Sequence, residues 1–255
     1  MNTSFSLARV EQLFKKQFIE NYKIYLMSLS IIVGSELFIF FIHIMEHSPI
    51  SLTEQISEFI FFLFAGGAIF TSTIFSEYAK PRTCSYAISL PATQFEKYFV
   101  KWMYSFVIFL VVMVAEFYLT YGVFVKSYHP KSYSGQYEGV LNLLDLPTYV
   151  YMLFLLIHSV FFYGAIYFSN KVHFIKTAFA VLGFMIIIEK ITEVAEHIMV
   201  PEIRDGLQLF NTRSDGNFFY KMDPFYFHQM LFAGVIVTIL LWVAAYFRLQ
   251  EKQVR

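Results

Sequence analysis

The sequence has little charge for its length of 255 residues. Charged residues make up 15% of it and hydrophobic residues 57%, whereas a soluble domain averages about 25% charged and about 45–50% apolar residues. This excess of apolar residues excludes an ordinary soluble domain and indicates a membrane protein. The formal net charge is zero, so the basic excess of nucleic-acid-binding proteins is missing. We therefore expect no nucleic-acid partner.

Several chemical motifs are also missing. The single cysteine, Cys84, excludes an internal disulfide and a cluster of cysteine metal ligands. None of the 11 glycines is followed by lysine, so the chain has no ATP-binding loop of the Gly-Lys-Ser/Thr type. No Gly-x-Ser-x-Gly elbow of a serine hydrolase occurs. We therefore expect that this chain is not an enzyme, and any ATP hydrolysis requires another chain.

Residues 43–47 fit the His-x-x-Glu-His pattern of a zinc peptidase family. We reject a catalytic zinc site because this short pattern lies at the outer mouth of a predicted span. It also lacks a recognisable third ligand in a soluble cleft. The chain is expected to bind no metal and no cofactor of its own.

Long apolar runs dominate the rest of the chain. A helix needs about 20 mainly apolar residues to cross about 30 Å of hydrocarbon, and six stretches qualify or nearly do. The sequence predicts an all-α integral membrane protein, with one transmembrane domain over residues 1–255. The six predicted transmembrane helices are residues 24–45, 59–75, 98–125, 148–168, 174–199 and 229–247. The second is short and Glu189 and Lys190 interrupt the fifth, so a five-span arrangement stays open.

The positive charges predict an orientation. Thirteen of the 19 lysines and arginines lie on one side of the predicted membrane and six on the other. Short cytoplasmic loops retain positive charge, so both termini are expected in the cytoplasm. The predicted location is the inner, cytoplasmic membrane of the cell.

Residues 5–22 have a different pattern from the spans. Leu7, Val10, Phe14 and Phe18 recur at intervals of three and four residues, with charged residues between them. This periodicity predicts an amphipathic helix. We expect it to lie on membrane lipid at the inner surface, as an N-terminal interfacial helix.

The cytoplasmic segment 77–97 leads into the third span. Pro81 and Pro91 bound the short stretch 82–90. After Pro91, Thr93 and Glu96 have the spacing of a capping box, which predicts that a helix begins there, before the chain enters lipid.

Ionisable residues inside spans are costly in lipid and usually face a cavity or a partner. Glu36, Glu116 and Lys190 lie at similar depths in their predicted helices. They predict a polar patch along a translocation route or at a conformational switch, with Lys190 neutralising one carboxylate. The alternatives are a buried structural ion pair, or helix ends drawn too long. His158 is expected to be a hydrogen-bonded packing residue, and Gly66, Gly67 and Gly164 to allow close helix packing.

The segment 89–99 reads Ser-Leu-Pro-Ala-Thr-Gln-Phe-Glu-Lys-Tyr-Phe. It resembles the Leu-Pro-hydroxyl-x-x-Glu coupling segment in permease subunits of ABC-2-type, or type V exporter-like, ABC transporters. The predicted order of elements is similar to that of this family. The resemblance implies that residues 5–22 are the family's connecting helix and that the coupling helix contacts a separate cytosolic ATPase. Residues implied in this contact are Arg82, Leu90, Pro91, Phe95, Glu96 and Lys97.

The resemblance further implies an exporter of an unidentified substrate, in which two permease subunits, identical or different, form a dimer. ATP and Mg²⁺ then bind the partner subunit. The chain departs from the family before the last span, where a re-entrant hairpin is usual, because residues 189–200 are charged and 201–228 are rich in turns. The alternative function is a membrane sensor or scaffold whose cytoplasmic loop binds a signalling partner.

Overall fold

The structure is a computed structural model that describes residues 5–75, 77, 91–128, 139–168, 173–198 and 224–254. Over these residues its regular structure is helical and contains no strand. The α-helices are α1 (Leu7–Glu46), α2 (Leu52–Phe61), α3 (Gly67–Thr73), α5 (Gln94–Trp102), α6 (Phe109–Ser127), α7 (Thr148–Phe168), α8 (His173–Ile198) and α10 (Pro224–Val254).

Two pairs of these helices are joined by π-helical segments. Phe62–Gly66 (η1) joins α2 to α3, and Met103–Ile108 (η3) joins α5 to α6. A short 3₁₀ helix, Leu143–Asp145 (η4), precedes α7. Each π segment inserts extra backbone into a long helix, so α2 to α3 and α5 to α6 are two long, interrupted rods.

Five helical stretches are long and apolar enough to cross a membrane. They are Leu7–Glu46, Leu52–Thr73, Gln94–Val125, Thr148–Phe168 and Leu231–Glu251. The chain is therefore a multi-pass helical membrane protein. The predicted fourth span has the same bounds as α7, whereas the second begins seven residues before its predicted start, at Leu52. The predicted fifth span falls on α8, whose apolar part among the described residues is the shorter stretch Phe174–Gly183.

The N-terminal helix predicted over residues 5–22 is continuous with the first predicted span. Residues 7–46 form the single helix α1, which is about 60 Å long at 1.5 Å per residue. No proline interrupts it, so the amphipathic stretch continues directly into the first span. Val10 is buried, whereas Leu7 and Phe18 are 76% and 56% exposed. The apolar face of this stretch is thus only partly packed against the bundle.

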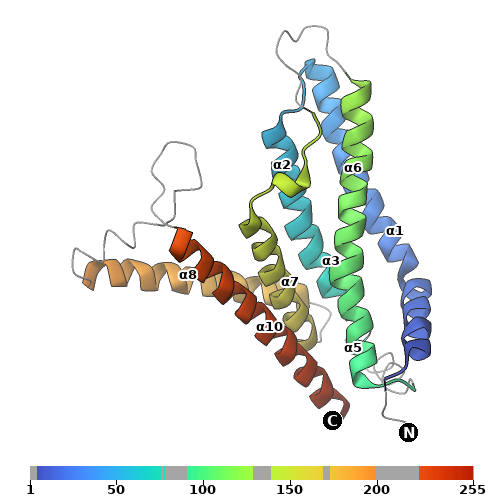
Figure 1. Ribbon diagram of the computed structural model, residues 1–255, viewed down its shortest axis with the longest axis vertical. Coiled ribbons are helices and arrows are strands. Elements are labelled where there is room, and N and C mark those ends of the chain that lie inside the picture. Colours follow the sequence, from blue (N-terminus) through green and yellow to red (C-terminus); the bar gives the residue numbers. More distant parts are fainter. Residues whose placement is uncertain are drawn as a thin grey trace.

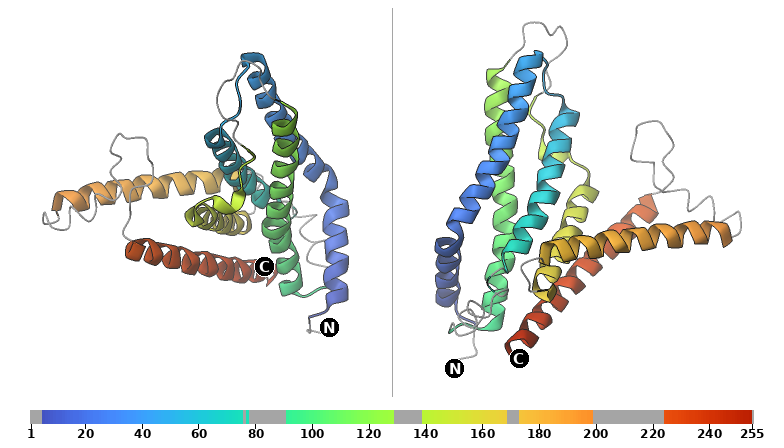
Figure 2. Two further views of the ribbon diagram at one scale, coloured as in Figure 1. Left: turned by 45° about the horizontal axis from the view of Figure 1, so that its top comes forward. Right: turned by 180° about the vertical axis from the view of Figure 1, so that it is seen from behind.

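The helices form a bundle with two members set at an angle. α1, α2 to α3 and α5 to α6 run side by side, and α7 lies next to α3 (Figure 1). α10 packs obliquely on α7 and α5, while α8 contacts α7 and α3 and extends away from the others (Figure 2). The first residues of α1 and the last of α10 lie at one end, here called the lower end (Figure 1).

Two aromatic clusters form the core. The lower cluster includes Val10, Phe75, Phe162 and Leu249, and therefore draws on α1, α7 and α10. The upper cluster packs side chains of α1, α2, α6 and α7. Its buried aromatic members are Phe40, Phe59, Phe109, Phe117, Tyr121 and Phe154.

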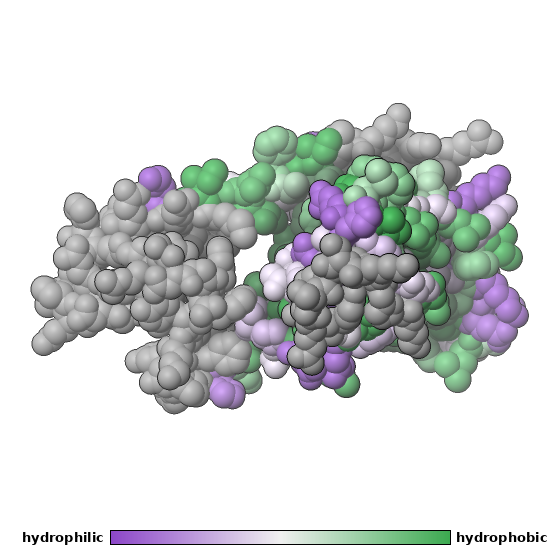
Figure 3. Space-filling view, turned by 90° about the horizontal axis from the view of Figure 1, so that it is seen from above, coloured by the Kyte–Doolittle hydropathy of each residue, from purple (hydrophilic) through white to green (hydrophobic). Residues whose placement is uncertain are grey.

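Apolar side chains also cover much of the outside. Seen from above, they form large areas with polar residues in separate patches among them (Figure 3). Ile31 and Phe38 of α1 are each 63% exposed, and Leu119 and Val123 of α6 are 69% and 66% exposed. Such surfaces suit lipid rather than water.

Candidate functional site

The helix that leads into the third span begins where the sequence predicts. Thr93 has an extended backbone and is the N-cap of α5. Its hydroxyl accepts a hydrogen bond from the Glu96 N–H at 3.2 Å, and Glu96 Oε2 accepts one from the Thr93 N–H at 2.7 Å. The predicted capping box is therefore confirmed, and two of the free N–H groups at the helix start are satisfied.

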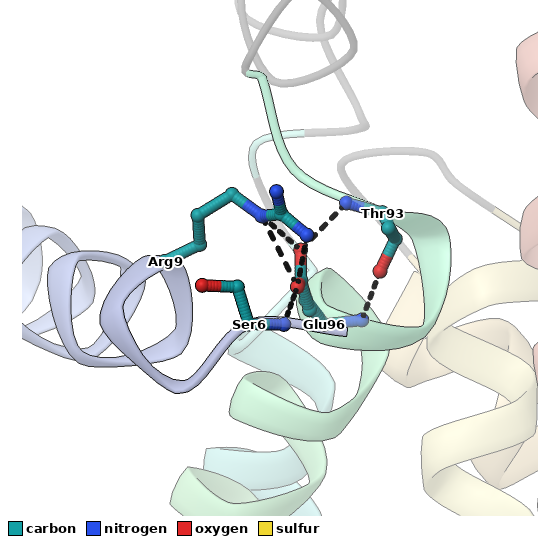
Figure 4. Close-up of polar contacts among 4 residues, drawn as sticks. All are labelled: Ser6, Arg9, Thr93 and Glu96. Carbon is teal, nitrogen blue, oxygen red and sulfur yellow. Dashed lines mark hydrogen bonds and ion pairs between the residues drawn. The ribbon is translucent and has the colours of Figure 1, made fainter. Parts of the chain in front are cut away.

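The same carboxylate also holds the start of α1. Glu96 Oε1 accepts a hydrogen bond from the Ser6 N–H at 2.7 Å and from Arg9 Nη2 at 2.9 Å. Arg9 Nε lies 3.1 Å from Glu96 Oε2 and 3.2 Å from Oε1. Figure 4 shows the guanidinium, the Ser6 amide and the Thr93 amide converging on Glu96. We call Ser6, Arg9, Thr93 and Glu96 the lower joint.

The position of Glu96 is favourable electrostatically. Its side chain is fully buried, whereas that of Arg9 is 27% exposed. Ser6 is the N-cap of α1 but makes no cap through its own side chain. The carboxylate therefore lies at the N-termini of two helices at once, where both helix dipoles favour a negative charge. Charge-assisted hydrogen bonds of this kind are stronger than neutral ones.

The residues implied in ATPase contact divide into two groups. Pro91 is exposed and Phe95 is 50% exposed, so both present surface at the lower end. Glu96 and Lys97 are buried, at 0% and 5% exposure. Arg82 and Leu90 lie outside the described residues, as does the rest of the predicted segment 82–90.

Phe95 belongs to an aromatic group at the lower end. Its ring centroid lies 6.0 Å from that of Phe5, 6.1 Å from that of Phe99 and 6.3 Å from that of Tyr246. These rings come from the start of the chain, from α5 and from α10. A partner that covers Phe95 therefore touches a surface connected to three parts of the chain.

A second charged network lies close to the lower joint. Lys101 Nζ forms an ion pair with Glu77 at 2.7 Å and donates a hydrogen bond to the Ile74 carbonyl at 2.9 Å. Lys16 of α1 lies 3.9 Å from the Glu77 carboxylate and 2.8 Å from that of Glu20. The network joins α1, the residues after α3 and α5. The sequence analysis missed it, although lysines near both predicted inner helix ends were a signal.

Burial alone would raise the pKa of Glu77, but the ammonium groups of Lys101 and Lys16 oppose that effect and hold the pKa below its ordinary value. The carboxylate is therefore ionised at neutral pH. Its negative charge is the feature that allows two lysines to gather at the lower end.

Two of the three ionisable residues predicted inside spans come together. Glu36 of α1 and Glu116 of α6 are 2% and 6% exposed, and their carboxyl groups are within hydrogen-bonding reach of each other. Lys190 lies on α8 and is exposed, and α8 packs on α7 and α3 instead of α1 and α6. Glu58 of α2, which the sequence analysis did not single out, lies beside the pair.

His158 is a packing residue, as the sequence predicts. It is fully buried in α7. Trp242 Nε1 lies 3.4 Å from its Nδ1, and Ser105 Oγ lies 3.1 Å from its Nε2. Because an indole N–H can only donate, Nδ1 is the acceptor and Nε2 carries the proton towards the serine oxygen. The histidine thus links α7, η3 and α10.

The His-x-x-Glu-His stretch lies at the upper end of α1. His47 has a left-handed backbone and caps α1, and its Nδ1 lies 3.1 Å from the Met45 carbonyl. His43 Nδ1 lies 2.9 Å from Ser48 Oγ. Within the described residues, no group of three His, Cys, Asp or Glu side chains is placed to hold a metal ion.

Comparison with models of protein families, with curated proteins and with solved structures found no match.

Proposed function

We propose that the chain is the permease subunit of an ABC-2-type transporter that moves a substrate out across the membrane. In this proposal a separate cytosolic ATPase binds ATP and Mg²⁺ and contacts the lower end of the bundle. Two supports come from the sequence, namely the Leu90-Pro91-Ala92-Thr93 and Glu96 pattern and the order of apolar helices. The proposal includes six crossings, with α8 as the fifth, and both termini in the cytoplasm.

The lower joint is the observation that carries the proposal. Because Glu96 binds the backbone of Ser6 and Thr93 and the side chain of Arg9, it fixes the start of α5 to the start of α1. Both helices continue into candidate spans. A displacement imposed on the exposed residues Pro91 and Phe95 therefore acts on two spans together. A signalling scaffold has no need for such a connection, whereas a transporter driven from its cytoplasmic end does.

The mechanism follows from this connection. ATP binding favours one arrangement of the ATPase pair and hydrolysis favours another, so the two states bind the permease surface unequally. The exposed ring of Phe95 supplies apolar contact with the ATPase. The buried carboxylate of Glu96 does not touch the ATPase itself, but transmits the displacement of α5 to α1. A second permease subunit completes the translocation route.

Purification of the tagged protein from its native host in mild detergent tests the proposal. Mass spectrometry of what is retained, together with an ATPase assay, should identify a soluble protein with a phosphate-binding loop in stoichiometric amount. We expect Phe95→Asp to abolish retention. The matched control is Leu144→Asp, at the upper end, where Leu144 is 88% exposed, and this variant should retain the ATPase.

Two outcomes would contradict the proposal. If cells shown to express a suitable ATPase yield a preparation without one, the sensor or scaffold function is favoured. If Phe95→Asp and Leu144→Asp retain the ATPase equally, the ATPase contact lies elsewhere. The proposed coupling role of the lower joint is then contradicted.

A further inference from the structure

Two glutamates from two helices lie against each other inside the bundle, and a third lies near them. Glu36 comes from α1, Glu58 from α2 and Glu116 from α6. The Glu36 and Glu116 carboxyl groups lie against each other, and the Thr120 hydroxyl donates a hydrogen bond to Glu116 Oε1 at 3.0 Å. The Tyr121 hydroxyl donates one to the Glu58 carboxylate. The three side chains therefore have different hydrogen-bond surroundings.

Glu36 and Glu116 each keep one oxygen without a partner. Glu36 Oε2 and Glu116 Oε2 are buried, and neither has a hydrogen bond to any described part of the chain. No lysine or arginine among the described residues forms an ion pair with either carboxyl group. The other titratable groups that face them are Glu58 of α2, with His43 of α1 and Tyr121 of α6 around Glu58.

Two adjacent carboxylates in such surroundings do not both stay charged. Burying one unpaired charge costs several kcal/mol, and a second like charge beside it adds repulsion. A single proton between the two groups removes one charge and supplies the missing donor. A metal ion does not fit, because the described residues contain no group of three suitable ligands.

We propose that Glu36 and Glu116 form a proton-binding site within the membrane, in which the two carboxyl groups share one proton at neutral pH. The site lies at the contact of α1 and α6. When these helices separate and water enters, both groups can ionise. By reciprocity, binding of the proton stabilises the closed contact and its loss favours separation. This inference does not depend on an ATPase partner.

Infrared difference spectroscopy of the purified protein in lipid nanodiscs tests the site directly. We expect a carbonyl stretching band of a protonated carboxyl group at neutral pH, which shifts in D₂O and disappears at alkaline pH. Glu36→Gln and Glu116→Gln should each remove this band, because the remaining carboxylate no longer shares its proton with another. Glu46→Gln is the matched control, because Glu46 is exposed at the end of the same helix, and it should keep the band.

A stability measurement covers the case in which a single variant folds poorly. On this proposal the folded protein holds one proton that the unfolded chain has released at neutral pH, so its stability should fall as the pH rises from neutral to alkaline values. The double variant Glu36→Gln and Glu116→Gln has no carboxyl groups at this site and therefore no proton to share. Its melting temperature should therefore fall less over this range than that of the wild type.

Several results would overturn the proposal. They are the absence of a protonated carboxyl band in the wild type, a band that survives both single variants, and a band removed only by Glu58→Gln. A wild-type protein without the band whose melting temperature rises when Na⁺ replaces choline would assign the site to a cation instead. Equal pH dependence in the wild type and the double variant would also contradict a shared proton.

Discussion

At the scale of single residues, Glu54 and Glu96 have the same role in two capping boxes but different surroundings. Glu54 closes its box with Ser51 at the start of α2 and is exposed. Glu96 is buried and also binds Arg9. We expect Glu54→Ala to lower the free energy of unfolding by about 1 kcal/mol, the cost of a lost cap. Glu96→Ala should lower it by about 3 kcal/mol, because the buried ion pair with Arg9 is lost together with the cap.

Chemical unfolding in detergent, followed by tryptophan fluorescence, measures both losses. Arg9→Lys provides a further comparison, because lysine keeps the charge but not the forked geometry that contacts both oxygens. Its loss should lie between those of Glu54→Ala and Glu96→Ala. Equal losses for the two alanine variants would mean that the contact with α1 adds nothing to the cap.

Glu77 predicts a pH dependence at the lower end. Because its pKa is held below the ordinary value of 4.5 in the folded protein, its ion pair stabilises the fold above that pH. This contribution is lost as the pH falls and the carboxylate becomes protonated. We expect the wild type to melt at a higher temperature than Glu77→Gln at neutral pH, and the difference to shrink below about pH 4.5. A difference that stays constant down to about pH 3 would show that the charge is irrelevant.

At the scale of helices, the contact between α7 and α8 depends on a glycine. A Cβ atom at Gly164 would lie 3.0 Å from the Cβ of Thr177 and nearer still to its side-chain tips. A change of threonine rotamer does not move its Cβ, so Gly164→Ala must push the two helices apart. We expect a clearly lower melting temperature for Gly164→Ala, partly restored by adding Thr177→Ala.

Gly122→Ala is the matched control for this variant. A Cβ atom at Gly122, also inside a long helix, meets nothing within 4 Å. Alanine favours helix over glycine by about 1 kcal/mol, so Gly122→Ala should leave the melting temperature unchanged or raise it. If both variants behave alike, close packing of α7 on α8 is not what Gly164 provides.

The helices themselves were predictable in unequal measure. α7 has the predicted bounds because its apolar run is unbroken, and the cap at Thr93 follows from a local pattern. The same pattern at Ser51 and Glu54 marks the start of α2, seven residues before the predicted second span. The change from amphipathic to fully apolar sequence at about residue 23 predicts a boundary that α1 does not have. Helical hydrogen bonds continue through such a change when no proline or cap interrupts them.

The contacts of the candidate site could be predicted only in part, because local sequence patterns do not show which helices are neighbours. Depth along a helix grouped Glu36 with Glu116, and the structure brings these together. It also grouped them with Lys190, because depth says nothing about which helices are neighbours. The contact of Arg9 with Glu96 joins residues 87 positions apart. Local patterns predicted the cap that Glu96 makes, but not its second partner.

At the scale of the whole molecule, the arrangement predicts the sides on which the helix ends lie. The start of α1 and the end of α10 are at one end of the bundle (Figure 1), which agrees with termini on the same side of the membrane. We expect cysteines placed at Lys15 and Glu251, in a Cys84→Ser background, to react with an impermeant maleimide only after the cells are opened. A cysteine at Leu144 should react in intact cells.

This labelling also tests the role of α8. If the cysteine at position 251 reacts in intact cells while the one at position 15 does not, the chain crosses an odd number of times. In that case α8 does not complete a crossing, and the five-span arrangement is correct. If all three positions react only in opened cells, the assignment of the upper end to the outside is wrong.

The long helix α1 runs in the same direction as α5 and α6, and two of its contacts with them involve buried carboxyl groups. Arg9 meets Glu96 near one end, and Glu36 meets Glu116 about 40 Å further along α1 at 1.5 Å per residue. Because these two contacts are far apart, they oppose sliding of α1 along α5 and α6. If the Glu36 and Glu116 contact opens together with the ring contacts of Phe40 above it while the lower joint holds, α1 swings away from α6 about the lower joint. The width of that opening is greatest at the end farthest from Arg9.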